Sequence, residues 1–128
     1  MTVAGFAAIA IGAVLGAWLR YVLTHLFNAT LPSLPLGTLL ANLIGGFLIG
    51  VAVEFFFIRH PALPPEWRLL VITGFLGALT TFSTFSAESV ELMQRGSYGW
   101  ALAHTGAHLF GSLTLTALGM FCARALKL

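Results

Sequence analysis

Residues Gly74–Ser86 read GFLGALTTFSTFS and lie inside the third of four long apolar segments. Gly74 and Gly77 begin the stretch, and each glycine weakens a helix by about 1 kcal/mol relative to alanine. Seven residues that carry five hydroxyl groups follow, Thr80–Ser86. Inside a bilayer, an irregular backbone is tolerated only where protein or a watery cavity satisfies its amides and carbonyls. The stretch therefore predicts a break in the third membrane helix, with freed backbone groups that need partners.

The same residues permit a second interpretation, which is a continuous helix. Serine and threonine hydroxyls can bond back to carbonyls one turn earlier on their own helix. Thr80–Ser86 would then form a polar face on an unbroken span. The two interpretations differ in whether backbone amides and carbonyls of this stretch lose their helical hydrogen bonds.

The composition places this stretch in a membrane. Hydrophobic residues make up 59% of the 128 residues, and charged residues make up 8%. Soluble domains carry about 25% charged residues, so this chain cannot cover a water-exposed surface. The net charge of +2 comes from dispersed residues and is too small for a nucleic-acid-binding surface. The sequence therefore predicts a protein embedded in the lipid bilayer, with no nucleic-acid partner.

Four segments are long enough to cross a bilayer, which takes about 20 apolar residues per helix. The expected spans run from about Val3 to Leu26, Gly37 to Ile58, Leu69 to Met93, and Trp100 to Leu126. The links between them are short and marked by polar residues or proline, so none can form a second domain. We expect an all-α integral membrane protein with one transmembrane domain, residues 1–128.

Basic residues are distributed weakly between the two sides of the membrane. Four spans put both termini and the middle link on one side, together with Arg59, Arg68, Arg124 and Lys127. The other side holds Arg95, joined by Arg20 if that side chain reaches outward. Orientation follows the excess of Lys and Arg, and this excess is small. The pattern is compatible with insertion in both orientations.

Polar residues form stripes on two of the expected spans. Asn42 has Thr38 four positions before it and Gly46 four positions after it. The fourth span carries a similar stripe, His104, His108 and Ser112. Polar groups in a membrane helix mark functional sites by default, although hydrogen bonds between helices explain many of them and contribute below about 2 kcal/mol each. The two stripes could therefore pack against each other or border a common polar path.

His104 and His108 also have the spacing of a two-histidine metal site. A catalytic zinc site needs a third ligand and usually a nearby general base. No glutamate is paired with these histidines in the sequence, so we do not expect a metal there. The chain also lacks the nucleophile, phosphate-loop and dinucleotide motifs of enzymes, and we predict that it is not an enzyme.

Phe82 and Phe85 are three positions apart and share a helical face. Packing against lipid or neighbouring helices is the simpler explanation, because the chain has eleven phenylalanines. The alternative uses the ring quadrupole, since the edge of an aromatic ring is positive. A small anion that sheds its water in a narrow pore needs such weak donors, together with amides and hydroxyls.

These residues resemble the Fluc/CrcB family of fluoride channels. The similarity is carried by Gly74–Glu88 in the third span and by Gly37–Gly45 in the second. Gly16–Arg20 in the first span and Gly111–Ser112 in the fourth also fit the family. The resemblance covers essentially the whole chain, and a signature of this length is specific.

The resemblance implies a fluoride-specific channel that exports fluoride passively and lowers its concentration in the cytoplasm. It implies an antiparallel, dual-topology homodimer in the bacterial inner membrane, with two pores that each use both subunits. It also implies a sodium ion at the dimer centre, structural or regulatory, held by backbone carbonyls. By the resemblance, the sodium ligands are Gly77 and Thr80.

The resemblance assigns the remaining site residues as follows. Nine positions would line or border the fluoride pathway: Thr38, Asn42, Phe82, Ser83, Thr84, Phe85, Glu88, His108 and Ser112. Arg20 would lie at a vestibule. Two positions depart from the family pattern, because His108 replaces a frequent serine and His104 replaces a tyrosine. A neutral imidazole still offers an N–H to an anion, and a protonated one would bind fluoride more tightly.

Two other functional classes remain open on the sequence alone. A small dual-topology, proton-coupled multidrug exporter would also have four spans, but it would carry an essential glutamate in the first. That span contains Arg20 and no acidic residue. A helper subunit that only packs through its glycines would show no ion flux by itself.

Overall fold

The computed structural model describes residues 2–128, and this part of the chain is helical, without a strand. Four helical runs are long and apolar enough to cross a membrane: Val3–Phe27, Leu36–Arg59, Pro65–Gln94 and Tyr98–Ala125. The predicted all-α architecture with four membrane-spanning helices is confirmed. The third run begins at Pro65 rather than near Leu69, and the fourth begins at Tyr98 rather than near Trp100.

Local signals set the ends of the first two runs. Helix α1 (Val3–Phe27) begins after Thr2, whose hydroxyl accepts a hydrogen bond from the N–H of Gly5. Helix α2 (Leu36–Val53) begins directly after Pro35, which cannot donate a backbone hydrogen bond. It continues without interruption into a π-helical turn, η1 (Glu54–Arg59).

The third run consists of four segments: α3 (Pro65–Arg68), the π-helical η2 (Leu69–Leu76), α4 (Gly77–Leu79) and α5 (Phe82–Gln94). Thr80 and Thr81 separate α4 from α5. Their backbones are extended, with φ and ψ of −83° and 153° at Thr80 and of −149° and 108° at Thr81. The polar stretch Thr80–Ser86 therefore begins with two non-helical residues.

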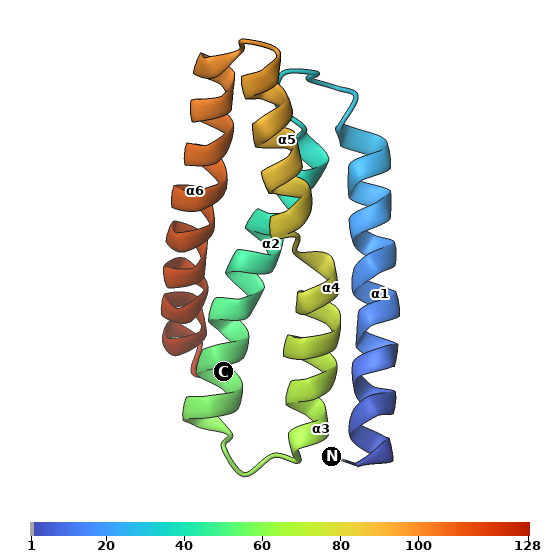
Figure 1. Ribbon diagram of the computed structural model, residues 1–128. Coiled ribbons are helices and arrows are strands. Elements are labelled where there is room, and N and C mark those ends of the chain that lie inside the picture. Colours follow the sequence, from blue (N-terminus) through green and yellow to red (C-terminus); the bar gives the residue numbers. More distant parts are fainter. Residues whose placement is uncertain (1) are drawn as a thin grey trace.

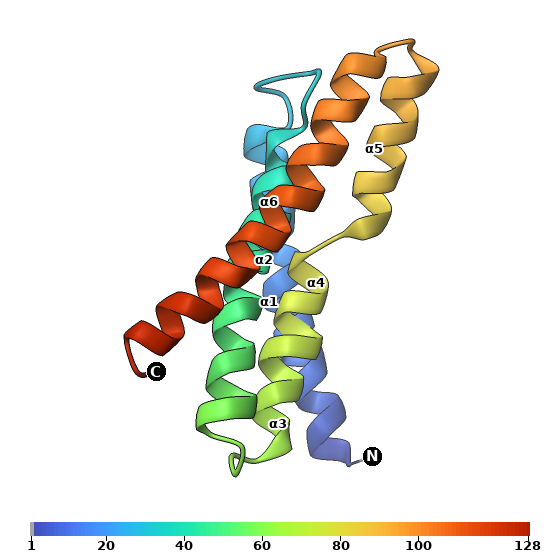
Figure 2. The same cartoon turned by 90° about the vertical axis from the view of Figure 1, so that its left-hand side faces the viewer.

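The four runs form a bundle in which the third run changes neighbours. Figure 1 places the N-terminus and the link between η1 and α3 at one end of the bundle, with the C-terminus in the same half. The links from α1 to α2 and from α5 to α6 (Tyr98–Ala125) lie at the other end. Figure 2 shows the extended link carrying α5 sideways, so that η2 and α4 pack beside α1 while α5 packs beside α6.

Glycines bring α1 and the third run into backbone contact. A Cβ atom on Gly12 would lie 2.1 Å from the carbonyl oxygen of Leu70, and one on Gly16 would lie 2.1 Å from that of Phe75. A Cβ on Gly74 would lie 2.6 Å from the carbonyl oxygen of Ile9. Gly74 therefore serves this close contact, and it lies within η2, several residues before the extended link.

Helices α2 and α6 approach each other in the same way. A Cβ on Gly50 would lie 2.1 Å from the carbonyl oxygen of Thr116, and one on Gly119 would lie 2.1 Å from that of Phe47. Such small-residue contacts are typical of membrane helices, where close packing replaces the hydrophobic effect between helices. The two glycine-lined contacts, α1 with the third run and α2 with α6, set the positions of the helices that carry the polar residues.

Ion pairs of the buried carboxylate of Glu54 join the end of the second run to α6. Glu54, which is 2% exposed, accepts a 2.8 Å hydrogen bond from Nε of Arg124. Nε of Arg59 lies 3.5 Å from the other oxygen of the same carboxylate. A buried carboxylate requires such partners, so this cluster ties the C-terminal part of α6 to η1.

Candidate functional site

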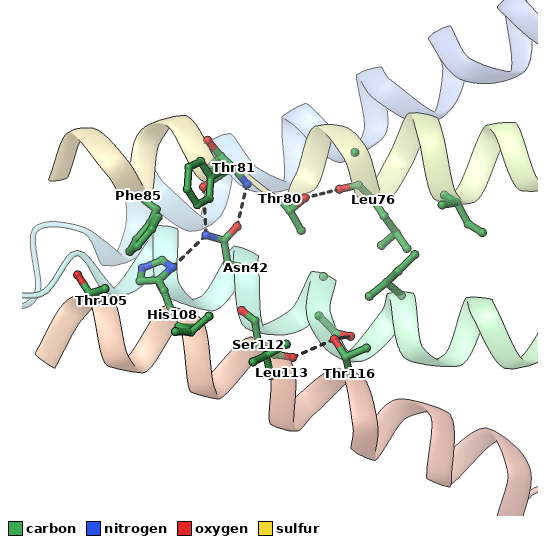
Figure 3. Close-up of a pocket in the computed structure, with 17 residues that line it drawn as sticks. Asn42, Leu76, Thr80, Thr81, Phe85, Thr105, His108, Ser112, Leu113 and Thr116 are labelled. Atoms are coloured by element: carbon green, nitrogen blue, oxygen red, sulfur yellow. Dashed lines mark hydrogen bonds between the residues drawn. The ribbon is translucent and has the colours of Figure 1, made fainter. Parts of the chain in front are cut away.

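A groove of about 670 Å³ lies between α2, the third run and α6 (Figure 3). Its lining includes seven of the site residues predicted from the sequence: Asn42, Gly77, Thr80, Phe82, Phe85, His108 and Ser112. They come from three separate runs, and the change of neighbours at the extended link brings them together. The groove lining is mostly apolar, with a short series of polar groups along it.

Asn42 fixes the extended link from the α2 side. Its Oδ1 accepts a 2.8 Å hydrogen bond from the N–H of Thr81, and its Nδ2 donates a 3.1 Å bond to the carbonyl oxygen of the same residue. The side chain thus replaces both backbone partners that Thr81 would have in a helix. The same pair of bonds fixes which end of the amide is oxygen and which is nitrogen.

The extended link interrupts the helical hydrogen-bond ladder and leaves several carbonyls before it without their usual partners. In a continuous helix the N–H of Thr81 would reach the carbonyl of Gly77, but it bonds to Asn42 instead. The N–H of Thr84, which would reach the carbonyl of Thr80, bonds to the hydroxyl oxygen of Thr81. The carbonyl of Ala78 accepts a 2.9 Å bond from Nε of a side chain on α1, Arg20.

Arg20 lies on the opposite side of the link from the groove. It borders a second, smaller pocket of about 380 Å³ that also contains Tyr21, Thr24, Asn28, Thr81 and Thr84. Thr81 lines both cavities, so the link forms a thin partition between them. Because its Nε bonds to the carbonyl of Ala78, Arg20 is held against the third run rather than extending freely toward solvent.

The hydroxyl groups of the polar stretch are used locally. Thr81 donates from its hydroxyl to that of Thr84 at 2.9 Å, and Ser83 lies 3.3 Å from the same hydroxyl of Thr81. The hydroxyls of Thr80 and Ser86 bond back to carbonyls one turn earlier, those of Leu76 and Phe82. Back-bonding, the basis of the continuous-helix interpretation, thus occurs in the extended link itself, at Thr80, and in α5, at Ser86.

The two phenylalanines occupy different environments. Phe85 is half-buried, and its ring centroid lies 5.4 Å from that of His104 and 4.7 Å from that of His108. Phe82 is 79% exposed, although its ring lies 5.5 Å from that of Phe85. Phe82 therefore lines the groove with most of its ring exposed on the single chain.

Behind the groove, a buried polar network joins the two stripes recognised in the sequence. Thr38 donates from its hydroxyl to Oε1 of Glu88 at 2.6 Å, and Asn28 bonds to both the N–H and the hydroxyl of Thr38. Oε2 of Glu88 lies 3.1 Å from Nε2 of His104, whose Nδ1 lies 3.0 Å from the hydroxyl of Ser89. Thr38, Ser83 and Glu88 therefore support the groove region without lining the groove.

This network corrects one inference drawn from the sequence, that no glutamate is paired with His104 and His108. Glu88 lies on α5 and both histidines lie on α6, so the pairing arises only when the helices pack. Asn28 and Ser89 were not recognised as network members, because a residue at a helix end and a lone serine have no distinguishing pattern.

His108 presents one ring nitrogen to Asn42 and leaves the other free (Figure 3). The distance from its Nδ1 to Nδ2 of Asn42 is 3.0 Å. Because Asn42 is fixed as the donor, Nδ1 must accept, and a neutral ring then carries its proton on Nε2. Nε2 is buried and has no hydrogen-bond partner within residues 2–128. The site therefore contains one buried N–H group available to a ligand or to water.

Comparison with known proteins gives a consistent result. The profile of the family described as CrcB-like protein, Camphor Resistance (CrcB), matches residues 7–120. A protein of Cupriavidus pinatubonensis, named fluoride-specific ion channel FluC, is 61% identical over 122 residues, which is 95% of this chain and 96% of the relative.

Proteins with the same name occur in other bacteria. The one from Ralstonia nicotianae is 58% identical over 95% of this chain and 96% of its own length. The one from Burkholderia thailandensis is 60% identical over 92% of this chain and 91% of its own length. The resemblance noted in the sequence is thereby confirmed, and this multi-pass membrane protein belongs to the CrcB family.

Proposed function

We propose that this chain is a subunit of a fluoride-specific ion channel, which lets fluoride leave the cytoplasm passively across the bacterial inner membrane. Its relatives at about 60% identity carry that name over nearly their whole length. The observation that carries the proposal is the convergence of Asn42, Phe85, His108 and Ser112 on one groove at the broken helix. A channel moves ions without chemical change, and the chain is not an enzyme.

The pathway would follow the polar side of this groove. Fluoride is small and strongly hydrated, so it needs donors that replace water without holding the ion too tightly. The N–H of His108, the hydroxyl of Ser112 and the positive edges of Phe82 and Phe85 are of this kind. Asn42 would line the pathway and orient His108, because both hydrogens of its amide are already donated to Thr81 and His108. Thr38, Ser83, Thr84 and Glu88 would border the pathway and orient these groups. Arg20 would supply positive charge at the adjoining vestibule, which raises the local concentration of anions.

The working unit would be an antiparallel homodimer, with the second copy covering the groove. Three features support a partner there: the apolar lining, the exposed ring of Phe82, and the space beside Gly77. A Cβ on Gly77 would meet only the carbonyl oxygen of Ile72, at 3.7 Å, so the fold itself does not require glycine. The weak charge bias supports a dimer in which the two copies have opposite orientations.

A sodium ion would lie at the dimer centre, held by the carbonyls of Gly77 and Thr80 from both copies. These two carbonyls have lost the hydrogen bonds of a continuous helix, because Asn42 and the Thr81 hydroxyl take the corresponding N–H groups. Carbonyls of unwound membrane helices are suitable sodium ligands. One chain offers too few of them to enclose the cation, and a second copy would complete the set.

A flux assay tests the function. Purified protein is reconstituted in liposomes loaded with sodium fluoride, and efflux is followed with a fluoride electrode, with chloride efflux measured in parallel. We expect fluoride efflux and no chloride efflux. Absence of efflux from monodisperse, reconstituted protein would overturn the channel assignment and would instead favour a helper subunit.

Two measurements test the assembly separately from the flux. A cysteine placed at Ser97 in a Cys122→Ser background should react with an impermeant maleimide in about half of the molecules from each side of the membrane. Labelling from one side alone would exclude dual topology. Gly77→Val should weaken dimerisation more than Gly99→Val, because Gly99 has open space around its Cα and lies away from the groove.

A further inference from the structure

Three metal-binding side chains meet next to the groove, although none of them is adjacent to another in the sequence. Glu88 of α5 and His104 and His108 of α6 each offer one ligand atom, and the three atoms lie within 4.8 Å of one another. Oε2 of Glu88 and Nε2 of His104 are already 3.1 Å apart. Both histidines are buried, with 0% and 4% of their surface exposed.

The free Nε2 of His108 is the second observation. It is the one histidine nitrogen in residues 2–128 that is both buried and without a hydrogen-bond partner. Buried polar atoms are almost always paired, so an unpaired one calls for a ligand, an ion or a water molecule. His108 also belongs to the cluster with a carboxylate and a second imidazole, and a cation is a ligand that all three groups can share.

We propose that Glu88, His104 and His108 form a binding site for a transition-metal dication of the zinc, cobalt or nickel class. Two imidazoles and one carboxylate form a familiar ligand set for zinc, and they leave a fourth position for water. Imidazole ligands favour these metals over Mg²⁺ and Ca²⁺, which prefer oxygen. The i, i+4 spacing on α6 places both rings on one side of the helix, with ring centroids 4.5 Å apart.

The surrounding hydrogen bonds already orient two of the three ligands. The hydroxyl of Thr38 donates to Oε1 of Glu88, which leaves Oε2 for the metal. The hydroxyl of Ser89 lies 3.0 Å from Nδ1 of His104 and can accept a hydrogen bond from an N–H at that position. When a metal binds, the proton on Nε2 of His104 can therefore move to Nδ1, and the ring remains hydrogen-bonded. Partners of this kind typically change metal affinity by about 10- to 100-fold.

The third ligand, His108, is opposed by Asn42. Binding through Nε2 requires the proton of His108 to move to Nδ1, where it would face the N–H of Asn42. Asn42 cannot rotate its amide without losing both bonds to Thr81. Asn42 should therefore lower the affinity for the metal, and a hydrogen-bond acceptor at this position should raise it. Asn42→Asp supplies that acceptor.

The proposal is tested by metal binding to the full-length protein in detergent, after removal of any histidine tag. Zinc affinity is measured by equilibrium dialysis with Zn²⁺ alone, and the absorption spectrum of the Co²⁺ form reports the coordination geometry. We expect one site per chain with a tetrahedral Co²⁺ spectrum. His104→Gln, His108→Gln and Glu88→Gln should each weaken Zn²⁺ binding at least tenfold.

Four matched variants sharpen this test. Ser89→Ala should weaken binding and Asn42→Asp should tighten it, each by about tenfold. His60→Gln and His25→Gln, which change exposed histidines away from the site, should leave the affinity unchanged. Elution as a single species on size exclusion establishes that each variant is folded. Equal Zn²⁺ affinity in wild type and His104→Gln, or no binding by the wild type, would overturn the proposal and leave the free Nε2 to water.

Discussion

Asn42 and Thr81 lie 39 positions apart and hold each other by two hydrogen bonds of opposite direction. The amide oxygen of Asn42 accepts from the backbone N–H of Thr81, and its nitrogen donates to the backbone carbonyl. One side chain therefore satisfies the backbone at the point where the third run stops being helical. The same amide faces His108, so the shape of the backbone and the orientation of the imidazole are set together.

Replacing Asn42 by alanine should disrupt this arrangement. The substitution leaves the N–H and the carbonyl of Thr81 without partners, and each unpaired buried group costs about 1–3 kcal/mol. We expect a lower unfolding temperature in detergent, followed by tryptophan fluorescence, and a fluoride flux reduced at least tenfold. Ile44→Ala, which shortens an exposed side chain on the same helix, serves as the control. A normal flux in Asn42→Ala would show that the two bonds are dispensable.

Arg20→Lys separates the charge of Arg20 from its geometry. The bond to Ala78 uses Nε, an atom that lysine cannot place in the same position. We expect Arg20→Lys to lower both the flux and the unfolding temperature, and Arg20→Gln to lower them further. If Arg20 acts only by attracting anions to the vestibule, the lysine variant will retain wild-type flux. The measurement is initial fluoride efflux at low and high ionic strength, because screening weakens attraction by charge alone.

Phe82→Ile removes a ring edge while keeping a large apolar side chain. Phe82 is 79% exposed in the single chain, so its loss should leave the subunit fold almost unchanged. We expect the fluoride flux to fall at least tenfold while the unfolding temperature stays within a few degrees. The matched control is Phe110→Ile, which changes an exposed ring of α6 that lies outside the groove. Unchanged flux in Phe82→Ile would remove this ring from the mechanism.

The sequence predicted the helices and the polar stretch, but it could not predict how the polar residues are partnered. Hydrophobic length is a local property, so four spans follow from counting apolar residues. The pairing of Glu88 with His104 depends on the packing of α5 against α6, which sequence spacing does not encode. Gly74 is a second example. The sequence suggested that this glycine weakens the helix, and the structure shows that it permits close contact with α1.

Other features have no sequence signature. The π-helical turns η1 and η2 continue regular apolar segments, in which periodicity cannot distinguish them from α-helix. Arg20 was assigned to a vestibule by resemblance, but its bond to the carbonyl of Ala78 joins residues 58 positions apart. The bonds of the Thr81 backbone to Asn42 were not predicted either, because the hydroxyl-rich sequence suggested a role for side chains and gave no sign of one for the main chain.

Gly50→Ala should be poorly tolerated, whereas Gly106→Ala should not be. The new Cβ at Gly50 would lie 2.1 Å from the carbonyl oxygen of Thr116, so α2 and α6 would have to separate. Overpacking of this kind costs about 1–3 kcal/mol. A Cβ at Gly106 would approach nothing closer than the ring of Phe110, at 4.0 Å. The unfolding temperatures of the two variants should therefore differ clearly, and equal values would contradict the close contact of these helices.

The ion pair of Glu54 can be tested by a double-mutant cycle. Arg124→Gln leaves a buried carboxylate with Arg59 as its remaining partner, at 3.5 Å. We expect a loss of about 1–3 kcal/mol, less than for a fully isolated buried charge because Arg59 remains. Glu54→Gln combined with Arg124→Gln should recover part of this loss, because the uncompensated charge is gone. Additive losses in the double variant would show that the pair is not coupled.

The extended link at Thr80 and Thr81 affects the stability of a newly synthesised chain before it pairs. A lone subunit in the bilayer presents carbonyls without helical partners and an exposed ring, Phe82, on the face of the groove. Under the proposed dimer, folding and pairing are then linked, and the stability of each chain depends on how many copies share the membrane. Synthesis at a low level would leave more unpaired chains open to membrane proteases. The same linkage would let a non-conducting variant that still pairs reduce fluoride resistance when it is made alongside the wild type.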